Sequence, residues 1–87
     1  MSENTVYIGR KPVMQYVMAI MTALQRGPTV VRARGRSISI AVDAVEVVRH
    51  KFKSLVINGI EIGTDVLGEP GDLRNVSTIG IKVARPE

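Results

Sequence analysis

The stretch IGRKPVMQYVMAIMTAL, residues 8–24, decides the fold of this chain of 87 residues. Together with the residues that flank it, this stretch predicts a strand over 4–9 that ends at Gly9 and a helix over 12–26. Pro12 takes the first helical position, where its missing N–H costs nothing. One apolar stripe of the helix is formed by Val13, Val17, Ile20 and Leu24. A second is formed by Met14, Met18 and Met21. We expect so apolar a helix to be covered on more than one side, by the core or by a second subunit.

The remaining sequence predicts three more strands and one more helix. The strands are expected over 29–33, 55–63 and 75–84, and the helix over 37–53, with Ser37 as its cap. Asn58-Gly59 predicts a bulge or bend, and the glycines and proline of 64–74 predict a turn-rich hairpin connection.

The order of elements is therefore βαβαββ. It predicts one α/β domain over residues 1–87, with two layers, a mixed four-stranded sheet and two helices. The chain is too short for two independent cores, and a lone core of this size is only marginally stabilising, so self-association is expected.

Basic residues are concentrated in the first part of the chain. Twelve Lys and Arg against eight Asp and Glu give a formal net charge of +4. Residues 1–36 hold six basic groups and one acid, whereas residues 37–87 hold six basic groups and seven acids. This asymmetry favours a positive face that meets a polyanion, although solvated surface charge is the alternative.

Two strand-to-helix junctions carry the basic groups. Gly9-Arg10-Lys11 precedes the first helix and Arg34-Gly35-Arg36 precedes the second. If the first two strands are parallel, both junctions lie at the same edge of the sheet, with two helix N-termini. Glycine lets a backbone approach a phosphate and arginine grips phosphate with a bidentate fork. We therefore expect anion binding here; the alternative is that the glycines only shape turns.

The expected anion is a polymer backbone. Neither a G-x-G-x-x-G motif nor a P-loop is present, and no helix offers a run of base-reading side chains. Aromatic residues are limited to Tyr7, Tyr16 and Phe52, so the stacking platform of an RRM or OB-fold is not expected. Binding without sequence preference follows.

An enzyme, a metal centre and a bound cofactor are not expected. The chain has no cysteine and one histidine, and it lacks a clustered carboxylate site. No apolar run approaches the roughly 18 residues needed to span a bilayer, and no signal peptide is visible. The expected location is the cytoplasm, without membrane association.

The segments IGRKPVMQYVMAIMTAL, RARGRSISIAVDAVEVVRHKF, IEIGTD and NVSTIGIKV resemble the Alba family of archaeal chromatin proteins over about residues 4–84. The resemblance implies a fold similar to the C-terminal domain of translation initiation factor three. It implies a homodimer that binds double-stranded DNA without sequence preference and coats and compacts chromosomal DNA. It also implies RNA binding, and a primarily RNA-directed module, such as a ribonucleoprotein subunit or RNA chaperone, remains the alternative.

The resemblance also implies roles for single residues. Arg10 and Lys11 match the family's basic pair, usually two lysines of which the first is acetylated, so that here only Lys11 is available for acetylation. Arg34 and Arg36 match the arginines of its RGR motif, and Asn4 a polar position near DNA. The hairpin at 64–74, with Arg74, matches an arm that reaches toward the minor groove, and Phe52 a contact between neighbouring dimers. The set of expected nucleic-acid contacts is Asn4, Gly9, Arg10, Lys11, Arg34, Gly35, Arg36 and Arg74.

Overall fold

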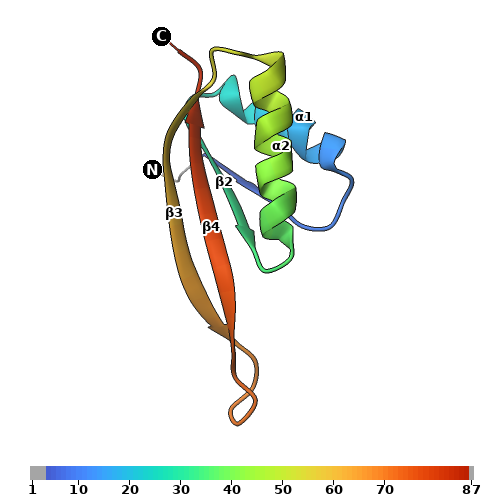
Figure 1. The fold of residues 1–87 in the computed structure, drawn as a ribbon, viewed down its shortest axis with the longest axis vertical. Helices are drawn as coiled ribbons and strands as arrows, with labels where there is room; N and C mark the ends of the chain where they lie inside the picture. Colours follow the sequence, from blue (N-terminus) through green and yellow to red (C-terminus); the bar gives the residue numbers. More distant parts are fainter. Residues whose placement is uncertain (1–3, 87) are drawn as a thin grey trace.

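The computed structural model describes residues 4–86 and has the predicted βαβαββ order. Its elements are β1 (Thr5–Tyr7), α1 (Val13–Leu24), β2 (Thr29–Arg34), α2 (Ser37–Lys51), β3 (Val56–Leu67) and β4 (Arg74–Ala84). The four strands form one mixed sheet in the order β1-β2-β4-β3, in which only β1 and β2 are parallel. The predicted fold class is therefore confirmed (Figure 1).

The core lies between the two helices and one face of the sheet. Alternate residues of the strands enter it, among them Val6, Val31, Ile81 and Val83. From α1 come Val17 and Ile20, and from α2 come Ala41, Ala44 and Val48, all fully buried. The opposite face of the sheet carries no helix; it is called the open face below.

Two details of α1 differ from the prediction. The helix begins at Val13, with Pro12 at its N-cap, and it ends at Leu24. Met14 and Met18 are exposed, while Met21 packs against the core. The second apolar stripe is thus only partly covered within one chain.

The prediction that Ser37 caps α2 is wrong. Arg36 holds the N-cap position and makes no capping hydrogen bond with its side chain. The Ser37 hydroxyl instead donates a hydrogen bond to the Gly9 carbonyl oxygen, at 3.2 Å. The hydroxyl therefore donates to a backbone carbonyl distant in sequence and does not accept from the first N–H groups of the helix, because Arg36 already has helical φ and ψ and Ser37 lies inside the first turn.

β3 and β4 extend beyond the rest of the sheet as a two-stranded arm (Figure 1). β2 pairs with β4 only as far as Thr78, so residues 64–67 and 74–77 pair with each other alone. The connection is therefore 68–73, shorter than the predicted 64–74. The predicted irregularity at Asn58-Gly59 is confirmed as a register shift between Ile57 and Gly59. The arm contributes to a longest dimension of 49 Å, against 29 and 18 Å for the others.

Helix length also bears on membrane association. No helix within residues 4–86 is long and apolar enough to cross a bilayer.

Candidate functional site

The two basic junctions lie at the same end of the sheet. Because β1 and β2 are parallel, with Tyr7 opposite Arg32, the turns that follow them leave the sheet at one edge. This end of the body is the one from which the arm extends (Figure 1). The four cationic side chains of these turns are exposed to solvent; they are Arg10, Lys11, Arg34 and Arg36. We call this surface the basic edge; it consists of Gly9, Arg10, Lys11, Arg34, Gly35 and Arg36.

A buried tyrosine of α1 holds the first junction. The Tyr16 hydroxyl oxygen accepts hydrogen bonds from the backbone N–H groups of Gly9 and Lys11, each at 2.9 Å. A Cβ on Gly9 would stand 3.1 Å from this oxygen, so glycine permits the close approach. Sequence reasoning treated Tyr16 only as a rare aromatic residue. Its position one turn into the helix, beside the junction, is the signal that could have revealed this contact.

The second junction is tied both to the first and to the arm. Ser37 bonds to the Gly9 carbonyl, as described above, so Gly9 is held through both its N–H and its C=O. The N–H of Gly35 donates to the Ser77 carbonyl at 2.8 Å. Gly35 has a φ of +58°, which residues other than glycine rarely adopt. The cations therefore project from a turn network with fixed backbone partners.

One carboxylate stands close to the basic edge. Asp65 Oδ2 of β3 lies 3.9 Å from Arg34 Nη1, and both side chains are more than half exposed. An exposed pair at this separation contributes little to stability. Its consequence is that a phosphate approaching Arg34 meets a nearby negative charge, which sequence reasoning did not identify.

Arg74 lies apart from the basic edge, at the far end of the paired strands of the arm. It stands opposite Leu67 and is exposed. Arg34 pairs with Thr78, four residues along β4 from Arg74, which corresponds to roughly 13 Å along the strand. Because residues 74 and 78 lie on the same face of β4, Arg74 and Arg34 project from the open face of the sheet.

Asn4 lies at the other end of the sheet. It precedes β1, and its side-chain amide donates to the Ala23 carbonyl at 2.8 Å and to Thr29 Oγ1 at 3.1 Å. These bonds fasten the start of β1 to the turn between α1 and β2. The structure does not bring Asn4 together with the basic edge, and we leave it out of the interface proposed below.

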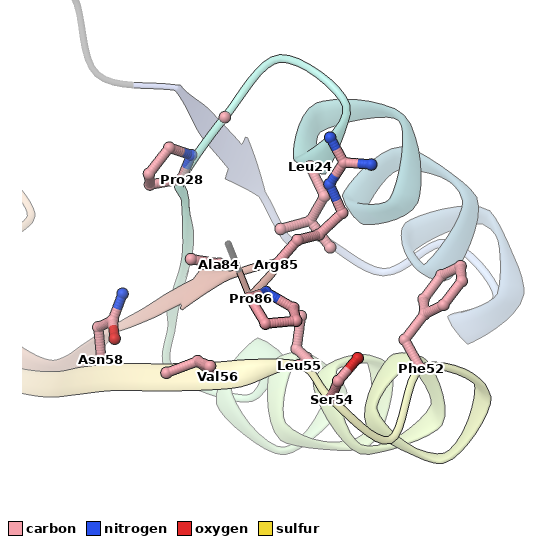
Figure 2. Close-up of a pocket in the computed structure, with 11 residues that line it drawn as sticks. Leu24, Pro28, Phe52, Ser54, Leu55, Val56, Asn58, Ala84, Arg85 and Pro86 are labelled. Carbon is pink, nitrogen blue, oxygen red and sulfur yellow. The ribbon is translucent and has the colours of Figure 1, made fainter.

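Phe52 also lies away from the basic edge, at the C-terminal end of α2. Its side chain is 43% exposed and borders a hollow of about 850 Å³ that is lined mostly by apolar groups. Figure 2 shows Phe52 at one side of this hollow, with Leu55 and Val56 along the chain that follows α2. The hollow contains no cluster of ionisable groups; Arg85 is its only charged lining residue among those described.

The acidic side chains and the histidine form no metal site in the described part of the chain. No group of three or more His, Asp or Glu side chains is placed to hold a metal ion within residues 4–86. The Glu46 carboxylate of α2 pairs with the Arg49 guanidinium at 2.9 Å. His50 Nδ1 lies 2.7 Å from the Glu46 carbonyl oxygen and is exposed.

The fold and the basic edge define a class of small two-layer α/β domains that present cations from two neighbouring strand-to-helix turns. The profile of the Alba family matches residues 4–64. The chain is 47% identical over 88 residues to the DNA/RNA-binding protein Alba of Methanocella arvoryzae, covering 97% of this chain and 92% of the relative. It is 44% identical over 88 residues to the DNA/RNA-binding protein Alba 1 of Archaeoglobus fulgidus, covering 98% and 99%.

A solved structure supports the same family assignment. Alba from Thermoplasma volcanium superposes with a TM-score of 0.84 at 36% identity, covering 93% of this chain and 99% of that one. The protein belongs to the Alba family, as its motifs indicated.

Proposed function

We propose that this protein is a non-catalytic, sequence-independent binder of double-stranded DNA that coats and compacts chromosomal DNA in the cytoplasm and also binds RNA. The observation that carries the proposal is the convergence of Arg10, Lys11, Arg34 and Arg36 on one edge of a single sheet. The printed names of two relatives, which state DNA and RNA binding, support the same class of ligand.

Affinity arises mainly from phosphate contacts. Each neutralised phosphate releases counterions, so the logarithm of the binding constant falls by about 0.9 per decade of salt for each contact with B-DNA. The four cations of the basic edge therefore contribute about −3.6 to the slope per protomer, and a contact by Arg74 brings the total to about −4.5. Gly9 and Gly35 let the junction backbones approach the phosphates. Arg74 adds a contact further along the duplex, and acetylation of Lys11 would remove one charge.

We further propose that the protein acts as a homodimer. β3 exposes aliphatic side chains on the helix side of the sheet; they are Ile57, Ile60, Ile62 and Val66. The first three stand opposite the core-facing Val83, Ile81 and Ile79 of β4, and Val66 stands opposite Asn75 in the arm. Ile62 is 83% exposed. A row of this kind on a small domain is typical of a subunit interface. A two-fold dimer doubles the basic surface and presents two arms to one duplex.

Phe52 and its hollow fit a contact between neighbouring dimers on DNA. They lie on a surface away from the basic edge, so bound nucleic acid leaves them free. This contact, like the homodimer, stays a prediction.

The test of the function compares the wild type with the double variant Arg10→Ala, Lys11→Ala by fluorescence anisotropy. Labelled duplex DNA and duplex RNA of matched length and random sequence are titrated at several salt concentrations. We expect linear log–log plots, with the slope of the double variant reduced by about 1.8 per protomer. Unchanged affinity and slope in a folded variant would contradict the site, and the DNA-to-RNA ratio decides between the chromatin function and a primarily RNA-directed one.

The dimer is tested separately with Ile62→Lys, measured by sedimentation velocity. A lysine at the centre of an apolar interface is expected to give a folded monomer, whereas Lys82→Ala, on the open face, keeps the wild-type mass. If Ile62→Lys stays dimeric, the interface does not involve this row of β3 side chains.

A further inference from the structure

The open face of the sheet carries a second surface, which adjoins the basic edge. It is a hollow of about 440 Å³ whose lining includes Tyr7 of β1, Arg34 of β2, Asp65 of β3 and Thr78 of β4. We propose that this hollow binds an unpaired base of a single-stranded nucleic acid, with Tyr7 as the stacking platform. The inference rests on the proposed function, because the strand must first be held by the basic edge.

Tyr7 has no packing role that accounts for it. Val6 and Ile8 enter the core, so the alternation of β1 turns Tyr7 to the open face, where it is 75% exposed. It stands opposite Arg32 in the parallel ladder, and β1 is an edge strand, so one side of the ring has no neighbouring strand. A ring in this position offers a π-face to any base, and base–aromatic stacking is the main source of affinity in sequence-tolerant single-strand sites.

The groups around Tyr7 match the other parts of a nucleotide. Arg34 belongs both to this hollow and to the basic edge. It can therefore hold the phosphate that joins the strand on the basic edge to the nucleotide whose base lies in the hollow. Asp65, 3.9 Å from Arg34, offers a carboxylate that accepts hydrogen bonds from the exocyclic amino group of a base. Thr78 stands opposite Arg34 on one side and Gly63 on the other, and it adds a hydroxyl that can both donate and accept.

The geometry distinguishes unpaired from paired bases. In a duplex the amino group is engaged in pairing and both faces of the base are stacked, so only an unpaired base can lie against Tyr7. The carboxylate also predicts a preference: cytosine, which carries an amino group, binds better than uracil, which carries a carbonyl at that position. The two pyrimidines have the same ring size, so stacking differs little between them.

The experiment uses the full chain and labelled oligomers of about 12 nucleotides, within the site size of single-strand binders. The probes are cytosine-only and uracil-only RNA, a cytosine-only DNA, and a mixed-sequence duplex. Tyr7→Leu keeps an apolar side chain but removes the aromatic ring, and Tyr7→Phe is the matched control that keeps it. Thermal unfolding is measured for both variants to show that they fold.

We expect Tyr7→Leu to weaken binding of cytosine-only RNA and DNA by roughly 5- to 150-fold, the range of one stacked base, and binding of the duplex by less than about twofold. Tyr7→Phe binds all probes as the wild type does. The wild type prefers cytosine to uracil, and Asp65→Asn removes this preference.

Two results overturn the inference: a loss in Tyr7→Leu that is equal for single strands and duplex, or no loss for single strands. Either can occur while the Arg10 and Lys11 variant still weakens duplex binding, in which case the proposed function stands alone. If the wild type binds no probe at low salt, the proposed function itself fails.

Discussion

Replacing Tyr16 by phenylalanine tests how much the positioning of the first junction contributes to stability and binding when the number of cations stays the same. The change removes one hydroxyl oxygen from a side chain that is 7% exposed and leaves every cation in place. The N–H groups of Gly9 and Lys11 then lose their acceptor, to which each now bonds at 2.9 Å. A typical hydrogen bond contributes about 0.5–1.5 kcal/mol net, so the two together contribute roughly 1–3 kcal/mol. Because both hydrogen bonds are only partly buried, we take about 1.5 kcal/mol as the expected loss.

Two measurements follow from this magnitude. For a domain of this size, 1 kcal/mol corresponds to about 4–8 °C in the unfolding midpoint, so Tyr16→Phe is expected to unfold about 6–12 °C below the wild type. If the released junction must be ordered again on binding, the same energy lowers duplex affinity by up to about tenfold. The salt slope stays unchanged, because the number of phosphate contacts is the same.

Tyr7→Phe is the matched control, since it removes the same hydroxyl from an exposed ring and is expected to leave the unfolding midpoint and duplex binding unchanged. The reasoning is refuted if Tyr16→Phe melts and binds like the wild type. It is refuted equally if its salt slope flattens, because the hydroxyl would then be affecting the contacts themselves rather than their positioning.

Two further predictions concern charge near the interface. Asp65→Asn removes the carboxylate beside Arg34, so we expect duplex DNA to bind several-fold more tightly at about 50 mM salt. This gain in affinity fades at high salt as screening increases. A weaker complex would show that Asp65 orients the arginine. Arg74→Ala removes the cation of the arm, so the salt slope for duplex DNA is expected to fall by about 0.9 per protomer without a change in the unfolding midpoint. An unchanged slope in anisotropy titrations would mean that the arm does not reach a phosphate.

The arrangement of the body could be predicted from the sequence because its signals are local. Periodicity in 8–24 and the glycines and proline at the ends of the helix determine where strand and helix alternate. Parallel pairing of β1 and β2 then brings Arg10 and Arg34 to one edge by topology alone. The prediction failed at 64–67, where Gly68 and Pro70 suggested a loop, yet pairing with 74–77 continues the strand.

Side-chain partners were harder to predict, because they depend on what lies across the fold. Ser37 has the residue type and position expected of a cap, but its hydroxyl donates a hydrogen bond to the Gly9 carbonyl oxygen, which is distant in the sequence. Asn4 follows a strand pattern that gives no hint of its bonds to the turn at 27–29. Tyr7 was counted as an isolated aromatic residue, although the alternation of Val6 and Ile8 around it already implied an exposed ring.

The arm has an evolutionary consequence. Residues 64–67 and 74–77 form ladder pairs only with each other, while Ser77 also accepts a hydrogen bond from Gly35, so a change of length on the tip side of Ser77 leaves the packing between helices and sheet untouched. Each residue added to both strands lengthens the hairpin by about 3.4 Å, and adding two keeps the alternation of faces. Descendants of such a protein can therefore acquire a longer or shorter reach by small insertions at the 68–73 tip, while the inherited body continues to fold as before.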